Sequence, residues 1–167
     1  MTEFKPISRE AIPQALEKVE RYRLLNEPAE AESICLDVLA VDPENQQALV
    51  MLLLALTDQF RGGPPDCFRQ AEAIVPKLRD EYERAYYHGI IWERHGHAHA
   101  LKGVPGSATV AYAWVCRAME FYEQAEKLRP PGNDDALLRW NTCVRLIQRY
   151  HLHSEPADLF QPVLGED

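Results

Sequence analysis

The stretch Pro43-Glu-Asn45-Gln-Gln-Ala48-Leu49 returns later in the chain as Pro131-Gly-Asn133-Asp-Asp-Ala136-Leu137. The proline, asparagine, alanine and leucine keep their places in both copies, which begin 88 residues apart, at residues 43 and 131. In each copy a proline and an asparagine precede an apolar segment, a composition typical of a turn followed by the start of a helix. A turn-and-helix unit that recurs at long spacing indicates an array of structural repeats, in which each unit covers its neighbour.

Outside the two copies, apolar residues recur at the spacing of helices, and alternation typical of strands is absent. From Ile12 to Leu25 they fall three and four residues apart, which predicts an amphipathic helix. Similar stripes predict further helices, at about 28–41, 46–60, 66–79, 80–101, 108–128 and 133–150. The sequence therefore predicts an all-α fold of about seven helices, paired as a stack of antiparallel hairpins.

Turn-forming residues mark the ends of these helices. The clearest breaks are Gly62-Gly-Pro-Pro65, Lys102 to Ser107 and Pro130-Pro-Gly132. Pro76 is expected to end the regular part of its helix near Val75, and Ser107 is a candidate N-cap for the helix that follows it.

The repeats are most similar to tetratricopeptide repeats, whose pattern places a leucine-glycine pair and a tyrosine on one helix, then alanine, an aromatic residue and proline on the next. The matching residues in the first unit are Lys18-Val19, Tyr22, Ala31, Cys35 and Pro43, and those in the third are His88-Gly89, Trp92, Ala118, Tyr122 and the Pro130-Pro131 pair. The family's glycine place is filled only by Gly89, and Arg79 stands where the second unit's proline belongs.

The resemblance covers roughly residues 12–150 and implies a single repeat domain over residues 1–150, followed by a tail at 151–167. Its units are expected at about 12–45, 46–79 and 80–131, with a capping helix at 133–150. The third unit carries 17 extra residues between the family's positions, which predicts a hairpin whose two helices are each about two turns longer.

Composition narrows the class of partner. Lys and Arg total 18 against 26 Asp and Glu, a formal charge of −8, so neither nucleic acid nor an anionic membrane surface is an expected partner.

The first residues lack the apolar core of a secretory signal, and the longest apolar run, Ala48 to Leu56, is too short for a transmembrane helix. Four scattered cysteines on apolar stripes indicate reduced, buried thiols. These features predict a cytoplasmic protein.

The resemblance implies that a partner peptide binds the concave face formed by the first helix of each unit. Glu20, Val50 and Ile90 occupy places where chaperone-binding relatives carry basic or amide residues, so an apolar segment or amphipathic helix is the expected ligand. Two alternatives stay open: several of these residues pack between helices, or the apolar tail segment 157–164 occupies the groove or packs on the last helix. The predicted groove comprises Glu20, Arg23, Gln47, Val50, Leu54, Asp58, Tyr86, Tyr87, Ile90, Glu93, Arg94, Thr142 and Arg145.

The lengthened hairpin is a second candidate contact. Leu101, Val104, Val110 and Trp114 are expected near its tip, where exposed apolar side chains indicate a partner surface or a homodimer interface. The alternative is that the N-terminal segment, with Phe4 and Ile7, packs against the tip.

Signatures of catalysis are weak. No Gly-rich phosphate loop and no Gly-x-Ser-x-Gly elbow occurs, and Cys67 is either a nucleophile with a lowered pKa or, as expected, a buried thiol. His95 and His99 are four residues apart with His88 on the same face, so a metal site is the alternative to a binding module. No cofactor is predicted, and the sequence favours a non-enzymatic adaptor, chaperone or scaffold.

Overall fold

The structure, a computed structural model, describes residues 2–155, and over this range it contains seven α-helices, two short 3-10 turns and no strand. This confirms the all-α prediction of about seven helices. The helices are α1 (Ile12–Leu24), α2 (Pro28–Val41), α3 (Gln46–Asp58), α4 (Cys67–Ile74), α5 (Glu81–Ala100), α6 (Ser107–Leu128) and α7 (Asp135–Arg149).

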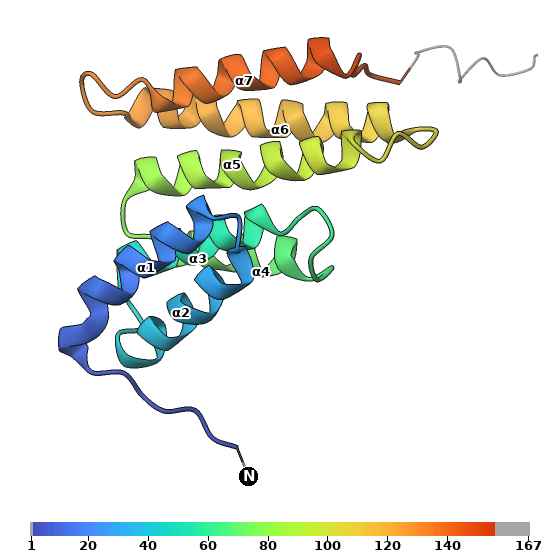
Figure 1. Cartoon of the computed structure of the whole chain (residues 1–167). Coiled ribbons are helices and arrows are strands. Elements are labelled where there is room, and N and C mark those ends of the chain that lie inside the picture. Colours follow the sequence, from blue (N-terminus) through green and yellow to red (C-terminus); the bar gives the residue numbers. More distant parts are fainter. Residues whose placement is uncertain (1, 156–167) are drawn as a thin grey trace, which may run out of the picture.

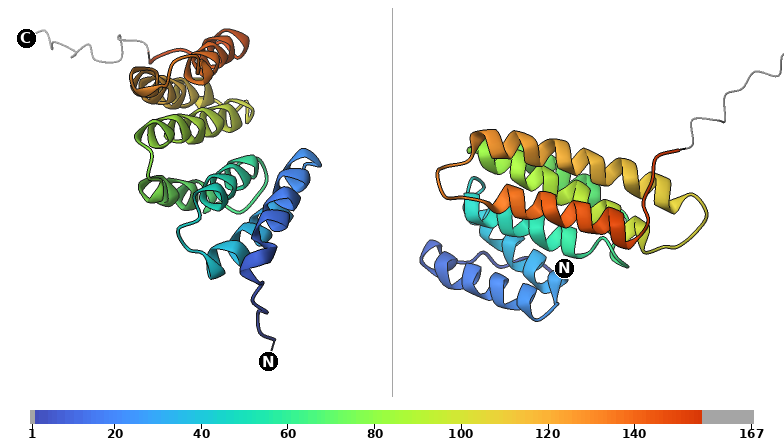
Figure 2. Two further views of the ribbon diagram at one scale, coloured as in Figure 1. Left: turned by 90° about the vertical axis from the view of Figure 1, so that its left-hand side faces the viewer. Right: turned by 90° about the horizontal axis from the view of Figure 1, so that it is seen from above.

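Consecutive helices pair as antiparallel hairpins, α1 with α2, α3 with α4 and α5 with α6, and α7 packs on α6 (Figure 1). The long α5 contacts α3 and α4 on one side and α6 and α7 on the other. Viewed along the helices, the α5–α7 layers lie on one side of the four N-terminal helices (Figure 2). Thus α5 joins the two halves of the molecule.

Local sequence explains where the helices begin and end. Asn45 accepts a hydrogen bond from the backbone N–H of Ala48 (2.9 Å) and so caps α3. Pro76 lies in a 3-10 turn, Val75–Lys77, that follows α4, so the predicted end of the regular helix near Val75 is confirmed. The predicted N-cap at Ser107 is wrong: the capping position is Gly106, whose φ of 81° favours glycine, and Ser107 is a buried first residue of α6.

The third hairpin is longer than the others, as predicted. Helices α5 and α6 have 20 and 22 residues, against 13 and 14 in α1 and α2, a difference of about two turns. Two glycines of α5 let the pair approach closely: a Cβ at Gly89 would lie 2.5 Å from the Tyr122 ring, and one at Gly96 would lie 2.8 Å from Val115 Cγ2.

Three apolar clusters form the core. One joins α1–α4 to Ile91 of α5, a second joins α5, α6 and α7 to Leu152, and a third lies between α1, α2 and the start of α3. Ile7 packs against this third cluster, while Phe4 is 99% exposed. The alternative in which these two residues cover the long hairpin is therefore wrong. The tail segment 157–164 lies outside the described residues.

No helix in the described part of the chain combines the length and the apolar character needed to cross a membrane.

Candidate functional site

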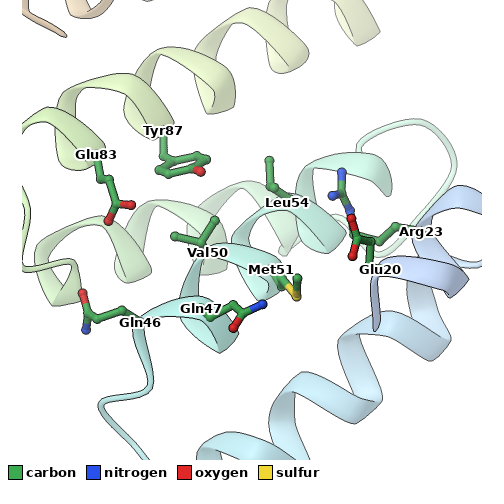
Figure 3. A pocket seen from close by; sticks show the side chains of 9 residues that line it. All are labelled: Glu20, Arg23, Gln46, Gln47, Val50, Met51, Leu54, Glu83 and Tyr87. Carbon is green, nitrogen blue, oxygen red and sulfur yellow. The ribbon is translucent and has the colours of Figure 1, made fainter. Parts of the chain in front are cut away.

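A hollow of about 460 Å³ lies where α1, α3 and α5 meet (Figure 3). Val50 and Leu54 of α3 point towards Tyr87 of α5 across it (Figure 3). Together with Met51 they form an apolar floor, which we call the groove floor. Polar side chains form its rim: Glu20, Arg23, Gln46, Gln47 and Glu83.

Six of the thirteen predicted groove residues line this hollow, namely Glu20, Arg23, Gln47, Val50, Leu54 and Tyr87. The prediction missed Gln46, Met51 and Glu83. Their spacing would have found them: Gln46 and Glu83 precede Val50 and Tyr87 by four residues, and Met51 follows Gln47 by four. Residues four apart share one face of a helix.

The prediction was wrong for two groove residues, Ile90 and Glu93, because both are buried. Ile90 is 3% exposed and belongs to the α5–α6–α7 core. Glu93 is 4% exposed; its carboxylate accepts hydrogen bonds from Tyr122 Oη (2.6 Å) and pairs with Arg139 of α7 (3.0 Å). Burial raises the pKa of Glu93, which Arg139 and Tyr122 oppose. For these two residues the alternative given in the sequence analysis is therefore correct: they pack between helices and do not line a groove.

Asp58 and Arg94, two further predicted groove residues, form an ion pair with each other. The carboxylate of Asp58 pairs with Arg23 of α1 (2.7 Å) and with Arg94 of α5, and Arg94 also donates to Thr57 Oγ1 (2.7 Å). This cluster of three charged residues links α1, α3 and α5 next to the groove floor. Arg23 lines the hollow and shares the single Asp58 carboxylate with Arg94, so these three residues together carry a net charge of +1.

The two predicted residues on α7 lie apart from the lining of the hollow. Thr142 donates to the carbonyl of Leu138 within its own helix (3.1 Å), and Arg145 is exposed. Neither is brought together with the groove floor.

A second hollow, of about 470 Å³, adjoins the first and shares Glu83 and Tyr87 with it. Tyr86, another predicted groove residue, lies here beside Tyr82; their rings stack at 5.7 Å with an interplanar angle of 13°. We call this space the tyrosine hollow. Its other lining residues are Asp80, Leu128, Pro130, Asn133 and Asp135.

At the hairpin tip, Leu101, Val104 and Val110 are 36%, 54% and 38% exposed. Trp114 is partly buried, because its ring stacks on His95 at 4.0 Å. Three of the four predicted contact residues are therefore accessible, and the contact itself stays a prediction.

Each histidine of the alternative metal site has its own neighbours. His88 Nε2 lies 2.7 Å from Glu72 Oε1, and its ring stacks on Phe121. His95 lies between the rings of Phe68 and Trp114. Burial, with smaller effects from His99 and Lys102, lowers the pKa of His95 to about 4. In residues 2–155 no group of three or more His, Cys, Asp or Glu side chains is placed to hold a metal ion.

The cysteines are free thiols, with Cys35, Cys67 and Cys143 buried and Cys116 partly so. Burial raises the pKa of Cys35 to about 12 and also raises that of Cys67. The alternative of Cys67 as a nucleophile with a lowered pKa is therefore wrong, since only the thiolate is nucleophilic.

The site thus consists of two adjoining hollows on the side of α5 that faces α1, α3 and the start of α7. Its floor is apolar and aromatic, and its rim carries carboxylates. Compared with models of protein families, with curated proteins and with solved structures, the chain gives no match.

Proposed function

We propose that this protein is a non-enzymatic interaction module of the tetratricopeptide type, which binds an amphipathic segment of a partner polypeptide in the groove between α1, α3 and α5. The observation that carries the proposal is the apolar groove floor of Val50, Met51, Leu54 and Tyr87 within a polar rim. Its volume, about 460 Å³, is in the range of pockets that receive ligands, about 300–1,000 Å³.

The charge of the rim favours one kind of segment. Two carboxylates, Glu20 and Glu83, flank the floor, against one cation of the rim, Arg23. The rim is therefore acidic, in line with the formal charge of −8 for the whole chain. Complementary charge steers association and selects partners, so the segment we propose carries Lys or Arg beside its apolar side chains.

Selection from a library of random peptides displayed on phage, with the full chain as bait, tests the proposal. Peptides that bind are expected to be amphipathic and basic, and their affinity is measured by calorimetry. Val50→Glu places a charge on the groove floor and is expected to weaken binding by about thirtyfold or more, the effect of a hot-spot residue.

Val110→Glu is the matched control, because it introduces the same change at the exposed hairpin tip. It is expected to leave peptide affinity unchanged. Failure to select any peptide, or equal affinity for wild type and Val50→Glu, would reject the groove. Loss of binding in Val110→Glu alone would assign the contact to the hairpin tip instead.

A further inference from the structure

We propose that the tyrosine hollow is a subsite for a cation: it receives the ammonium or guanidinium group of a Lys or Arg side chain on the segment bound in the neighbouring groove. The inference rests on the proposed function, because the cation belongs to the same partner. It adds the residue type that sets specificity and the place where that residue binds.

The aromatic wall has the geometry that attracts a cation. Tyr82 and Tyr86 stack nearly parallel, and Tyr87 meets Tyr86 edge to face at 5.2 Å and 79°. Three tyrosine rings from two successive turns of α5 thus line one space of about 470 Å³. A cation within about 6 Å of such a ring face is attracted by its quadrupole.

The carboxylates of the hollow complement the same charge. Asp80, Glu83 and Asp135 line it, and no Lys or Arg does. Asp80 caps α5 through the backbone N–H of Glu83, and Asp135 is the first residue of α7. The Glu83 carboxylate has no ion-pair partner in residues 2–155. Burial and Asp80 raise its pKa, as expected for a carboxylate without a cation nearby.

The arginines around the hollow are already engaged. Arg129 pairs with Asp134 and Arg139 with Glu93, and Arg94 shares the Asp58 carboxylate with Arg23. Arg84 donates to the carbonyls of Leu78 and Arg79. The chain therefore leaves the acidic face of the hollow to a cation from outside.

An organic cation fits the hollow better than the two other charged ligands. A carboxylate or phosphate would meet three like charges. A metal ion needs several ligands converging on one point, and the described residues offer no group of three carboxylate, histidine or thiol side chains that could hold one. A guanidinium or ammonium group needs no such convergence, because ring faces and carboxylates both stabilise it.

Continuity with the groove explains how one segment reaches both sites. Glu83 and Tyr87 line both hollows, since they lie one turn apart on the same face of α5. A peptide whose apolar side chains contact Val50 and Leu54 would therefore present a neighbouring basic side chain to Tyr82 and Tyr86.

The test uses NMR of the full chain with labelled tyrosine rings, titrated with N-acetyl-arginine amide, N-acetyl-lysine amide and the neutral analogue N-acetyl-citrulline amide. The arginine and lysine probes are expected to shift the Tyr82 and Tyr86 resonances saturably, and citrulline is not. Glu83→Gln and Asp135→Asn each remove one charge and are expected to weaken the arginine probe by about threefold to tenfold. Glu126→Gln, an equal change on the exposed face of α6, is the control and is expected to have no effect.

Three outcomes would overturn the inference: no saturable shift with either cation, equal shifts with citrulline, or undiminished arginine binding in both Glu83→Gln and Asp135→Asn. If the cation probes fail while selected peptides still require Val50, the groove stands and the cation subsite is rejected. If the probes bind while Val50→Glu leaves peptide affinity unchanged, the subsite stands and the groove is rejected.

Discussion

Gly89 shows how a single residue sets the distance between two helices. A Cβ atom at this position would lie 2.5 Å from Cε1 of Tyr122. The Tyr122 ring cannot easily retreat, because it is 1% exposed and its hydroxyl is held by the buried Glu93 at 2.6 Å. Gly89 is therefore a point of close approach between α5 and α6.

Gly89→Ala is therefore expected to destabilise the fold, although alanine favours a helix by about 1 kcal/mol over glycine. Overpacking against Tyr122 outweighs that gain, so the free energy of unfolding in urea should fall by about 1–2 kcal/mol. Glu81→Ala, an exposed change on the same helix, should alter it by less than about 0.5 kcal/mol. Equal or higher stability for Gly89→Ala would mean that Tyr122 is free to move.

His95 gives the stability a dependence on pH. Its pKa in the folded chain is about 4, against an ordinary value of 6.5, chiefly because of burial. The unfolded chain takes up this proton more readily, so the free energy of unfolding is greatest above pH 6.5 and falls as the pH is lowered towards 4. Because His95 is only partly buried, we expect a loss of about 1–2 kcal/mol.

His95→Phe keeps an aromatic ring between Phe68 and Trp114 and should remove this dependence between pH 6.5 and 4. Urea denaturation at a series of pH values measures it. His153→Gln, an exposed histidine, is the control and should follow the wild type. A slope in His95→Phe as steep as that of the wild type would assign the proton uptake to other groups, such as His97 and His99, whose pKa values burial also lowers.

At the scale of the helix, the repeated Pro-x-Asn stretch sets two helix starts in slightly different ways. Asn45 caps α3 directly, whereas Asn133 lies one residue ahead of the capping position, accepting from the N–H of Asp135 (3.0 Å) and from the Tyr82 hydroxyl (3.3 Å). Asn45→Ala should lower the free energy of unfolding, measured in urea, by about 1 kcal/mol. Asn45→Asp, which keeps the hydrogen-bond acceptor, should restore most of this stability. An equal loss of stability in both variants would show that Asn45 does not stabilise the fold by capping α3.

Most helix ends were predictable because local residues set them. Proline fixes φ and glycine permits positive φ wherever they occur, so Pro76 and the Gly62-Gly63 break were informative without tertiary structure. The exception, Ser107, failed because Gly106 supplies the left-handed turn and leaves the serine inside the helix. The length of the third hairpin was equally predictable, since apolar residues at helical spacing continue on both sides of the Lys102–Ser107 turn.

The groove was less predictable, because counting along a helix gives a direction and not the neighbour that covers it. Ile90 and Glu93 point to the expected side of α5, yet α7 covers them: Arg139, 46 residues after Glu93, reaches back to that carboxylate. Asp58 likewise recruits both Arg23 and Arg94. Such pairings depend on how far α7 and α1 lie from α5, which no local pattern encodes.

At the scale of the whole molecule, Leu152 is the last of the described residues to belong to the clusters that hold the stack together. This residue is 6% exposed, packs with the α5–α6–α7 cluster, and donates its backbone N–H to the carbonyl of Ile147 (3.0 Å). A chain ending at Glu155 keeps these contacts. It should therefore retain the helical circular dichroism and the unfolding free energy of the full chain.

A chain ending at Tyr150 loses Leu152 and should be less stable by about 1–3 kcal/mol in urea denaturation.

The chain ending at Glu155 also tests the alternative in which segment 157–164 competes for the groove. If that segment occupies the groove floor, the chain ending at Glu155 binds the selected basic peptides more tightly than the full chain does. Equal affinity would leave the groove to an external partner. Loss of the folded state on removing residues 156–167 alone would show that the fold requires those residues.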